Sequence, residues 1–162
     1  MKNKGFTLIE VIVAMAVFAV IITVVLSLFS MALRGHRKVI ALQNVQENAR
    51  FLMDFMVKEI RMSTINNSTP ASLSITRSDG NAVTYMFVGG KIERTSPSTS
   101  GPINSDEIFV TGSFYAEGGF MTPGNQQAKV TIVFKAESTG TKVEEKTSIR
   151  IQATLSQRNL GL

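Results

Sequence analysis

The first third of the chain is dominated by one continuous apolar segment. Between Val11 and Leu33 the sequence contains no charged residue and no proline. At about 1.5 Å per residue, this run predicts a helix of roughly 35 Å, which is long enough to cross the hydrocarbon core of a bilayer. Glu10 stands directly before the run. An unpaired carboxylate in lipid costs at least about 2.5 kcal/mol on insertion scales, so Glu10 is expected to need a partner.

Beyond Leu33 the helical pattern continues and becomes amphipathic. Charged side chains alternate in sign at Arg50, Asp54 and Lys58, each four residues from the next. Apolar residues recur at three- and four-residue spacing and therefore predict one buried face. That face comprises Leu42, Val45, Ala49, Leu52, Met56 and Ile60, and it is widened by Met53 and Phe55.

The same pattern sets the expected limits of the helix. We predict one long helix from about Phe6 to about Ser63. Gly35 is the position where a bend is most expected, because glycine lowers helix propensity by about 1 kcal/mol relative to alanine. The turn-forming residues 66–70 end at the first proline of the chain and are expected to close the helical region.

From Pro70 onward the apolar residues change to a period of two, which predicts β-strands. Four alternating runs occupy residues 72–76, 83–87, 130–134 and 148–155. Turn sequences fall between these runs at residues 78–81, 89–90, 118–119, 123–124 and 138–140. Residues 95–105 are rich in Ser, Thr, Pro and Gly and predict an exposed loop. Short connections favour antiparallel pairing, so we expect one antiparallel sheet whose apolar face covers the helix.

The residues that open the apolar segment carry a more specific signal. The sequence Gly5-Phe6-Thr7-Leu8-Ile9-Glu10-Val11 follows a short basic stretch at residues 1–4 and leads into an uninterrupted apolar helix. This arrangement resembles the N-terminus of precursors in the type IV pilin-like family, which includes pilins and the pseudopilins of type II secretion. The resemblance implies that a prepilin peptidase cuts between Gly5 and Phe6, that Phe6 is then N-methylated, and that Glu10 is the carboxylate that assists assembly.

The resemblance also implies a location and a set of partners. The chain would span the bacterial inner membrane once, with its N-terminus in the cytoplasm and its head in the periplasm, before it enters a pilus or pseudopilus. Cations flank the apolar run on both sides, so their distribution alone does not decide the orientation. The implied partners are the prepilin peptidase, other minor and major pilin or pseudopilin subunits, and inner-membrane lipid.

A physical argument supports the role of Glu10. Cleavage would create a cationic amine at Phe6, and this amine could pair with the Glu10 carboxylate of a neighbouring subunit in a medium of low dielectric constant. Side chains that face lipid can be exchanged for side chains that face other helices with little loss of apolar burial. The alternative is a plain membrane anchor with a glutamate near the interface, but this leaves the Gly5-Phe6 junction unexplained.

Together these patterns predict an α+β fold: a long N-terminal helix, membrane-spanning and then amphipathic, packed on a C-terminal antiparallel β-sheet. The expected segments are a leader peptide at 1–5, a transmembrane and assembly helix at 6–33, its amphipathic continuation at 34–65, and a β-rich head domain at 66–162. A head of about 100 residues can bury a modest core.

A second resemblance concerns the subgroup. Residues 47–61 and the closing Gln157-Arg158-Asn159 are similar to W-type minor pilins and J-type minor pseudopilins. This implies a minor type IV pilin, a low-copy subunit that helps to initiate or cap pilus assembly near the tip. A minor pseudopilin of type II secretion is the alternative within the family. A membrane-anchored periplasmic binding module is the alternative from another class.

The sequence offers little for catalysis. It contains no cysteine and a single histidine, His36, which stands in a basic cluster just after the apolar run. No phosphate-binding loop, nucleophile elbow or paired-histidine motif is present. We therefore expect no enzyme and no cofactor.

Two weaker signals concern the binding of calcium and of nucleic acid. Asn104, Asp106 and Glu107 offer oxygen ligands suited to calcium, but their spacing matches no calcium loop, and polar residues at the entry to a strand explain them better. The formal net charge of +5 suggests nucleic acid. Much of that charge lies next to the apolar run, at Arg34, Arg37 and Lys38, where lipid phosphates are the simpler partners. No aromatic-basic pattern predicts a nucleic-acid surface.

Overall fold

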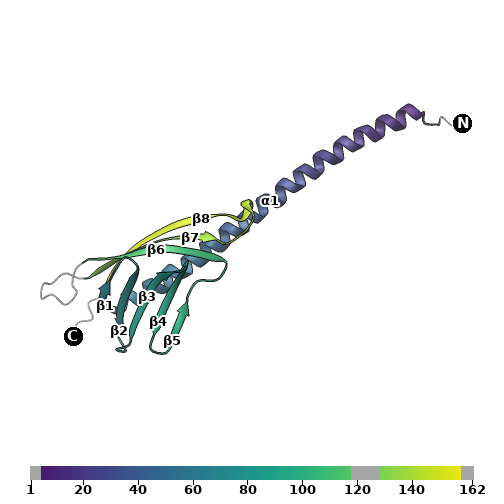
Figure 1. Cartoon of the computed structure of the whole chain (residues 1–162). Helices are drawn as coiled ribbons and strands as arrows, with labels where there is room; N and C mark the ends of the chain where they lie inside the picture. Colours follow the sequence, from purple (N-terminus) through teal and green to yellow (C-terminus); the bar gives the residue numbers. More distant parts are fainter. Residues whose placement is uncertain (1–4, 118–127, 158–162) are drawn as a thin grey trace.

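The computed structural model describes residues 5–117 and 128–157 of the chain. One helix, α1 (Leu8–Arg61), contains 54 residues and is therefore about 80 Å long. Figure 1 shows α1 as a rod whose N-terminal half projects from a head domain built by the strands. The helix is unbroken at Gly35. Lys58 and Arg61 lie in its last turn, where cations complement the negative end of the helix dipole.

The two halves of α1 differ in burial. Every side chain from Leu8 to Leu33 is exposed. The second half buries one face, as predicted: Val45, Ala49, Leu52, Met53, Met56 and Ile60 are all buried. Leu42 lies before the first buried residue and Phe55 lies on the flank, and both remain exposed. The amphipathic pattern therefore identifies the packed face but overestimates its width.

The end of α1 differs from the prediction. The helix stops at Arg61, and residues 63–65, which were expected to be helical, belong to strand β1 (Ser63–Ser68). The Ser63 Oγ donates to the Glu59 carbonyl at 2.6 Å and so satisfies a carbonyl at the helix terminus. Ile65 is buried and pairs with Ile75 of the next strand. Core packing and strand pairing thus outweigh the turn propensity of residues 66–70.

The described strands form two antiparallel sheets. The first has the order β1-β2-β3-β4-β5 and contains β1, β2 (Ser72–Arg77), β3 (Ala82–Val88), β4 (Lys91–Ser96) and β5 (Thr99–Pro102). The second has the order β6-β7-β8 and contains β6 (Ile108–Glu117), β7 (Lys129–Ser138) and β8 (Ser148–Ser156). A short 3₁₀ helix, η1 (Val143–Glu145), connects β7 to β8. The predicted α+β class, with a long helix on antiparallel strands, is confirmed.

The sequence predicted four of the described strands and missed the other four. The alternating runs correspond to β2, β3, β7 and β8, whereas β1, β4, β5 and β6 were not predicted. Residues 95–105 do not form a loop throughout, because they include the end of β4 and all of β5, with Ser96 paired to Thr99. These strands lack a regular apolar alternation, and pairing with neighbours forms them. The single predicted sheet is accordingly two sheets.

The turn at residues 89–90 is confirmed. Gly89 and Gly90 have φ angles of 57° and 78°, and they join β3 to β4 as a two-residue hairpin loop. Gly90 also permits a close approach, since a Cβ there would lie 2.0 Å from a ring carbon of Phe109. The turns predicted at residues 118–119 and 123–124 lie outside the described residues.

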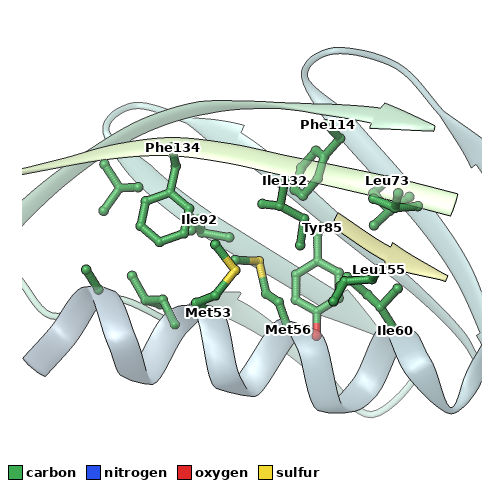
Figure 2. Close-up of a cluster of buried hydrophobic side chains, with 14 of the residues drawn as sticks. Met53, Met56, Ile60, Leu73, Tyr85, Ile92, Phe114, Ile132, Phe134 and Leu155 are labelled. Atoms are coloured by element: carbon green, nitrogen blue, oxygen red, sulfur yellow. The ribbon is translucent and has the colours of Figure 1, made fainter. Parts of the chain in front are cut away.

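The core lies where α1 meets both sheets. Figure 2 shows Met53, Met56 and Ile60 of the helix beneath side chains from the two sheets. The first sheet contributes Leu73, Tyr85 and Ile92, and the second contributes Phe114, Ile132, Phe134 and Leu155. The rings of Phe87 and Phe114 connect the sheets, with centroids 4.7 Å apart. The head is therefore built on the second half of α1, and the first half extends from it as a free apolar rod.

Candidate functional site

The first turn of α1 is organised by Thr7 and Glu10. The Glu10 Oε2 accepts a hydrogen bond from the Thr7 backbone N and another from the Thr7 Oγ1, both at 2.9 Å. In return, the Thr7 Oγ1 accepts from the Glu10 backbone N at 3.4 Å. This is a capping box, which satisfies amide groups that the helix itself leaves without partners. Its carboxylate also lies at the positive end of the helix dipole.

The residues before this turn are open to their surroundings. Phe6 is 87% exposed, and a Cβ added at Gly5 would meet no atom within 4 Å. Gly5 is also not among the described glycines with a positive φ. Neither space nor backbone conformation requires glycine here, so the fold does not account for Gly5. An exposed peptide bond between Gly5 and Phe6 is accessible to another protein.

The rod that follows is suited to lipid. α1 contains an apolar segment that is long enough to cross a membrane, and no residue of this segment is buried. Its hydroxyl groups are satisfied by the helix itself, because Thr23, Ser27 and Ser30 donate to the carbonyls of Val20, Val24 and Leu26 at 2.8, 2.8 and 3.0 Å. Polar groups in a bilayer need such internal partners.

Glu10 has a partner within its own chain, Thr7, which had not been predicted. The signal was present as Thr7-x-x-Glu10 directly before an apolar helix, which is the sequence pattern of a capping box. Both Thr7 donors reach Oε2, and the Glu10 residue as a whole is exposed. The site can therefore hold a carboxylate at the start of an apolar helix and still offer one oxygen to an additional donor.

A second polar cluster connects the end of α1 to the first sheet. Glu59 accepts from Arg94 through Nη2 to Oε1 at 2.6 Å and Nε to Oε2 at 2.9 Å. Tyr85 donates its hydroxyl hydrogen to the same carboxylate, and Arg77 lies 3.6 Å from it. Partial burial alone would raise the pKa of Glu59, but the hydrogen bonds and charges of these partners outweigh it and hold the pKa below its usual value.

This cluster is structural. Burial, followed by the hydrogen bond to Glu59, raises the pKa of Tyr85, so the phenol stays protonated and donates. The three strands that supply the partners, β2, β3 and β4, are thereby held to one helix side chain. The sequence did not identify Glu59 as a candidate, because a glutamate beside the apolar face of an amphipathic helix cannot be distinguished by sequence from a solvent-exposed one.

The other sequence candidates lie apart from these two clusters. Asn104 is buried; its Oδ1 accepts from the Ile92 backbone N at 2.9 Å, and its Nδ2 donates to the Ile108 carbonyl at 3.0 Å. Asp106 pairs with Lys91 at 2.7 Å, and that hydrogen bond lowers the pKa of Asp106. In the described residues no group of three His, Asp or Glu is placed to hold a metal ion. His36 is exposed on α1.

Comparison with known proteins gives one match. Residues 1–33 match the family described as "Prokaryotic N-terminal methylation motif". No curated protein and no solved structure matches the chain. The matched segment contains residues 1–5, the capping box and the apolar rod. It supports the resemblance of this N-terminus to type IV pilin-like subunits and membrane anchoring through the apolar helix, and it points to a structural subunit.

Proposed function

We propose that this protein is a minor type IV pilin, a low-copy subunit that acts near the tip of a pilus. The observation that carries the proposal is the capped Glu10 at the head of a fully exposed apolar helix within the methylation-motif match. In this proposal residues 1–5 form the leader, 6–33 the anchor, and the remainder an amphipathic helix and a head. The anchor spans the inner membrane once, and the head lies in the periplasm.

The proposed processing occurs at the exposed junction. A prepilin peptidase cuts between Gly5 and Phe6, and the new Phe6 amine is methylated. Thr7 stays in the mature chain, so the capping box survives the cut and Glu10 keeps two donors while the subunit waits in the membrane. An isolated carboxylate in lipid would be costly, and the cap reduces that cost.

The proposed assembly step uses the free oxygen of the same carboxylate. The Phe6 amine of a neighbouring subunit approaches Oε1 of Glu10 and forms a charge-assisted pair in a medium of low dielectric constant. The pair fixes the axial position of one subunit relative to the next. The exposed apolar side chains of the rod then exchange lipid contacts for helix contacts.

An exposed aromatic pair supports helix packing beyond the membrane. Phe51 and Phe55 lie four residues apart on α1, are 57% and 37% exposed, and have ring centroids 6.0 Å apart. Exposed aromatic pairs of this kind are typical of protein contact surfaces. We infer that this side of α1 meets the apolar helix of an adjacent subunit once the filament forms.

The experiment that tests the proposal has two parts. Mass spectrometry of the protein from its host membranes is expected to give a chain that begins at Phe6 and carries one added methyl group. Glu10→Ala is then expected to remove the subunit from sheared filaments but leave it in the membrane, while Glu47→Ala, an exposed glutamate elsewhere on α1, leaves both unchanged.

Each of three results would contradict the proposal or favour an alternative function. A chain that still begins at Met1 contradicts the processing. Normal function of Glu10→Ala favours an anchored periplasmic binding module, whose ligand would engage the sheets. A secretion defect, in a host whose neighbouring genes encode a secretin and secretion components, favours a minor pseudopilin of type II secretion, which the match at residues 1–33 supports equally.

A further inference from the structure

A groove of about 300 Å³ lies between α1 and the connection from β7 to β8. One wall is the helix segment from Arg37 to Val45, and the other contains residues 138–140 and Glu145 of η1. Figure 1 shows the η1 connection as the part of the head that lies closest to the projecting half of α1. The groove therefore lies at the end of the head from which the projecting half of α1 leaves.

Its depth relative to the bilayer follows from helix geometry. The argument rests on the proposed anchor, with Leu33 at the edge of the hydrocarbon core. Arg37 is four residues further on, or about 6 Å at the rise of an α-helix, and Val45 is about 18 Å away. The polar layer on each side of a bilayer is roughly 5–8 Å thick. The Arg37 end of the groove thus lies within the layer of lipid headgroups.

The groove is lined by charges of both signs that form no ion pair with one another in the part of the chain that the structure describes. Arg37 lines it together with Glu107 and Glu145, and among the described residues no ion pair links these three side chains to any partner. Its remaining lining is partly apolar, with Ile40, Ala41 and Val45 along the helix. A fitting ligand would carry both an anionic group, which suits Arg37, and a cationic group, which suits the two carboxylates.

We propose that this groove binds the headgroup of a phosphoethanolamine lipid from the membrane that holds the anchor. The lipid phosphate meets the Arg37 guanidinium, which binds phosphate oxygens with paired N–H groups. The primary ammonium of the same headgroup reaches the Glu145 or Glu107 carboxylate. A choline headgroup has no N–H to donate, and a glycerol headgroup has no cation, so each satisfies only half of the site.

The consequence is a defined resting position for the head. A headgroup held between α1 and η1 ties the head to the bilayer surface while the subunit is stored. Entry into a filament must release this contact. The lipid would thus favour the membrane pool over the filament, in competition with the Glu10 contact at the opposite end of the anchor.

The test is native mass spectrometry of the full-length protein, released from detergent micelles that contain equal amounts of phosphatidylethanolamine, phosphatidylcholine and phosphatidylglycerol. We expect phosphatidylethanolamine to be retained about tenfold more than phosphatidylcholine, the factor expected for a charge-assisted hydrogen bond. Arg37→Gln should remove most of this retention. Arg34→Gln is the matched control, because it deletes the same charge three residues away, outside the groove lining.

A second variant checks the cationic half of the headgroup. Glu145→Gln should lower the preference for phosphatidylethanolamine over phosphatidylcholine and leave phosphatidylglycerol retention unchanged or higher, while Glu47→Gln should have no effect. Equal retention of ethanolamine and choline lipids would overturn the proposal. So would equal losses in Arg34→Gln and Arg37→Gln, or a dominant preference for phosphatidylglycerol, since both indicate general attraction to an anionic surface. Because Glu10→Ala should retain the lipid normally, failure of this test is separate from failure of the assembly proposal.

Discussion

Arg94 of β4 holds Glu59 of α1 through two hydrogen bonds, and both side chains are largely buried, at 15% and 14% exposure. The helix contacts the head mainly through apolar side chains, and the hydrophobic effect that holds them together has no preferred direction. A two-pronged contact between a guanidinium and a carboxylate has one geometry, because both groups are planar. This pair therefore defines how α1 is oriented on the first sheet.

The first prediction concerns the stability of this junction. Arg94→Ala leaves the Glu59 carboxylate without its main partner and should lower the free energy of unfolding by about 2 kcal/mol, less than for a fully buried pair because some solvent reaches it. Urea denaturation of the protein in detergent micelles, monitored by hydrogen exchange of the amides in β3 and β4, measures this loss of unfolding free energy. Lys91→Ala breaks a pair whose carboxylate, Asp106, is fully exposed. An equal loss in this control would show that Arg94 has no special role.

The same cluster predicts a dependence of stability on acid. Because the pKa of Glu59 is lowered in the folded state, the unfolded state binds its proton more readily, and the stabilisation is present above the usual pKa of 4.5. It should be lost as the pH falls from that value through the lowered pKa. The urea midpoint measured from about pH 6 to about pH 3 reports this loss. Glu59→Gln should flatten that part of the profile, and an unchanged slope would contradict the assignment.

The third prediction separates processing from folding at Gly5. Neither Gly5 nor Gly35 has an atom within 4 Å of an added Cβ, so alanine fits at both positions. Gly5→Ala should leave the fold intact but strongly reduce cleavage, which is seen as retained precursor in intact mass. Gly35→Ala should process normally and stabilise the helix by up to about 1 kcal/mol. Normal cleavage of Gly5→Ala would remove the evidence that this glycine serves a peptidase.

The fourth prediction concerns the exposed side of α1. Phe51 and Phe55 lie outside the core cluster, so their replacement by alanine should lower thermal stability less than a core substitution would. Incorporation into filaments should fall by tenfold or more, since two aromatic residues at a contact centre contribute at least about 1.4 kcal/mol. Sheared filaments and membrane fractions are compared by quantitative immunoblot. Tyr115→Ala, an exposed aromatic on β6, is the control, and an equal effect there would argue against a specific helix contact.

Much of the helix was predictable because its determinants are local. The period of the apolar residues identified the face formed by Val45, Leu52 and Met56, and charge-free length identified the rod before it. The candidate assembly site was equally local, since Gly5, Phe6 and Glu10 lie within six consecutive residues. Even the partner of Glu10 was encoded nearby in the Thr7 capping box. Because these residues are so close together in the sequence, their spacing alone determines their relative positions.

Strands without alternation could not be recognised in the same way. β1 and β5 are short and polar, and they exist because neighbouring strands supply their hydrogen bonds. The division into two sheets depends on how β6 packs across the first sheet, where Phe87 meets Phe114. The sequence pattern of one strand does not show which other strand pairs with it, because the pairing depends on contacts between segments that are far apart in the chain.

The sequence by itself therefore determined the membrane-length rod, the residues at its start and the packed face of its continuation, because each depends on helical spacing alone. Only the tertiary structure brought Glu59 to Arg94 and Tyr85 from three elements, and only it placed Arg37 beside Glu107 and Glu145. Those groups are far apart in sequence, and the contacts between them exist only after the strands have paired and packed on the helix.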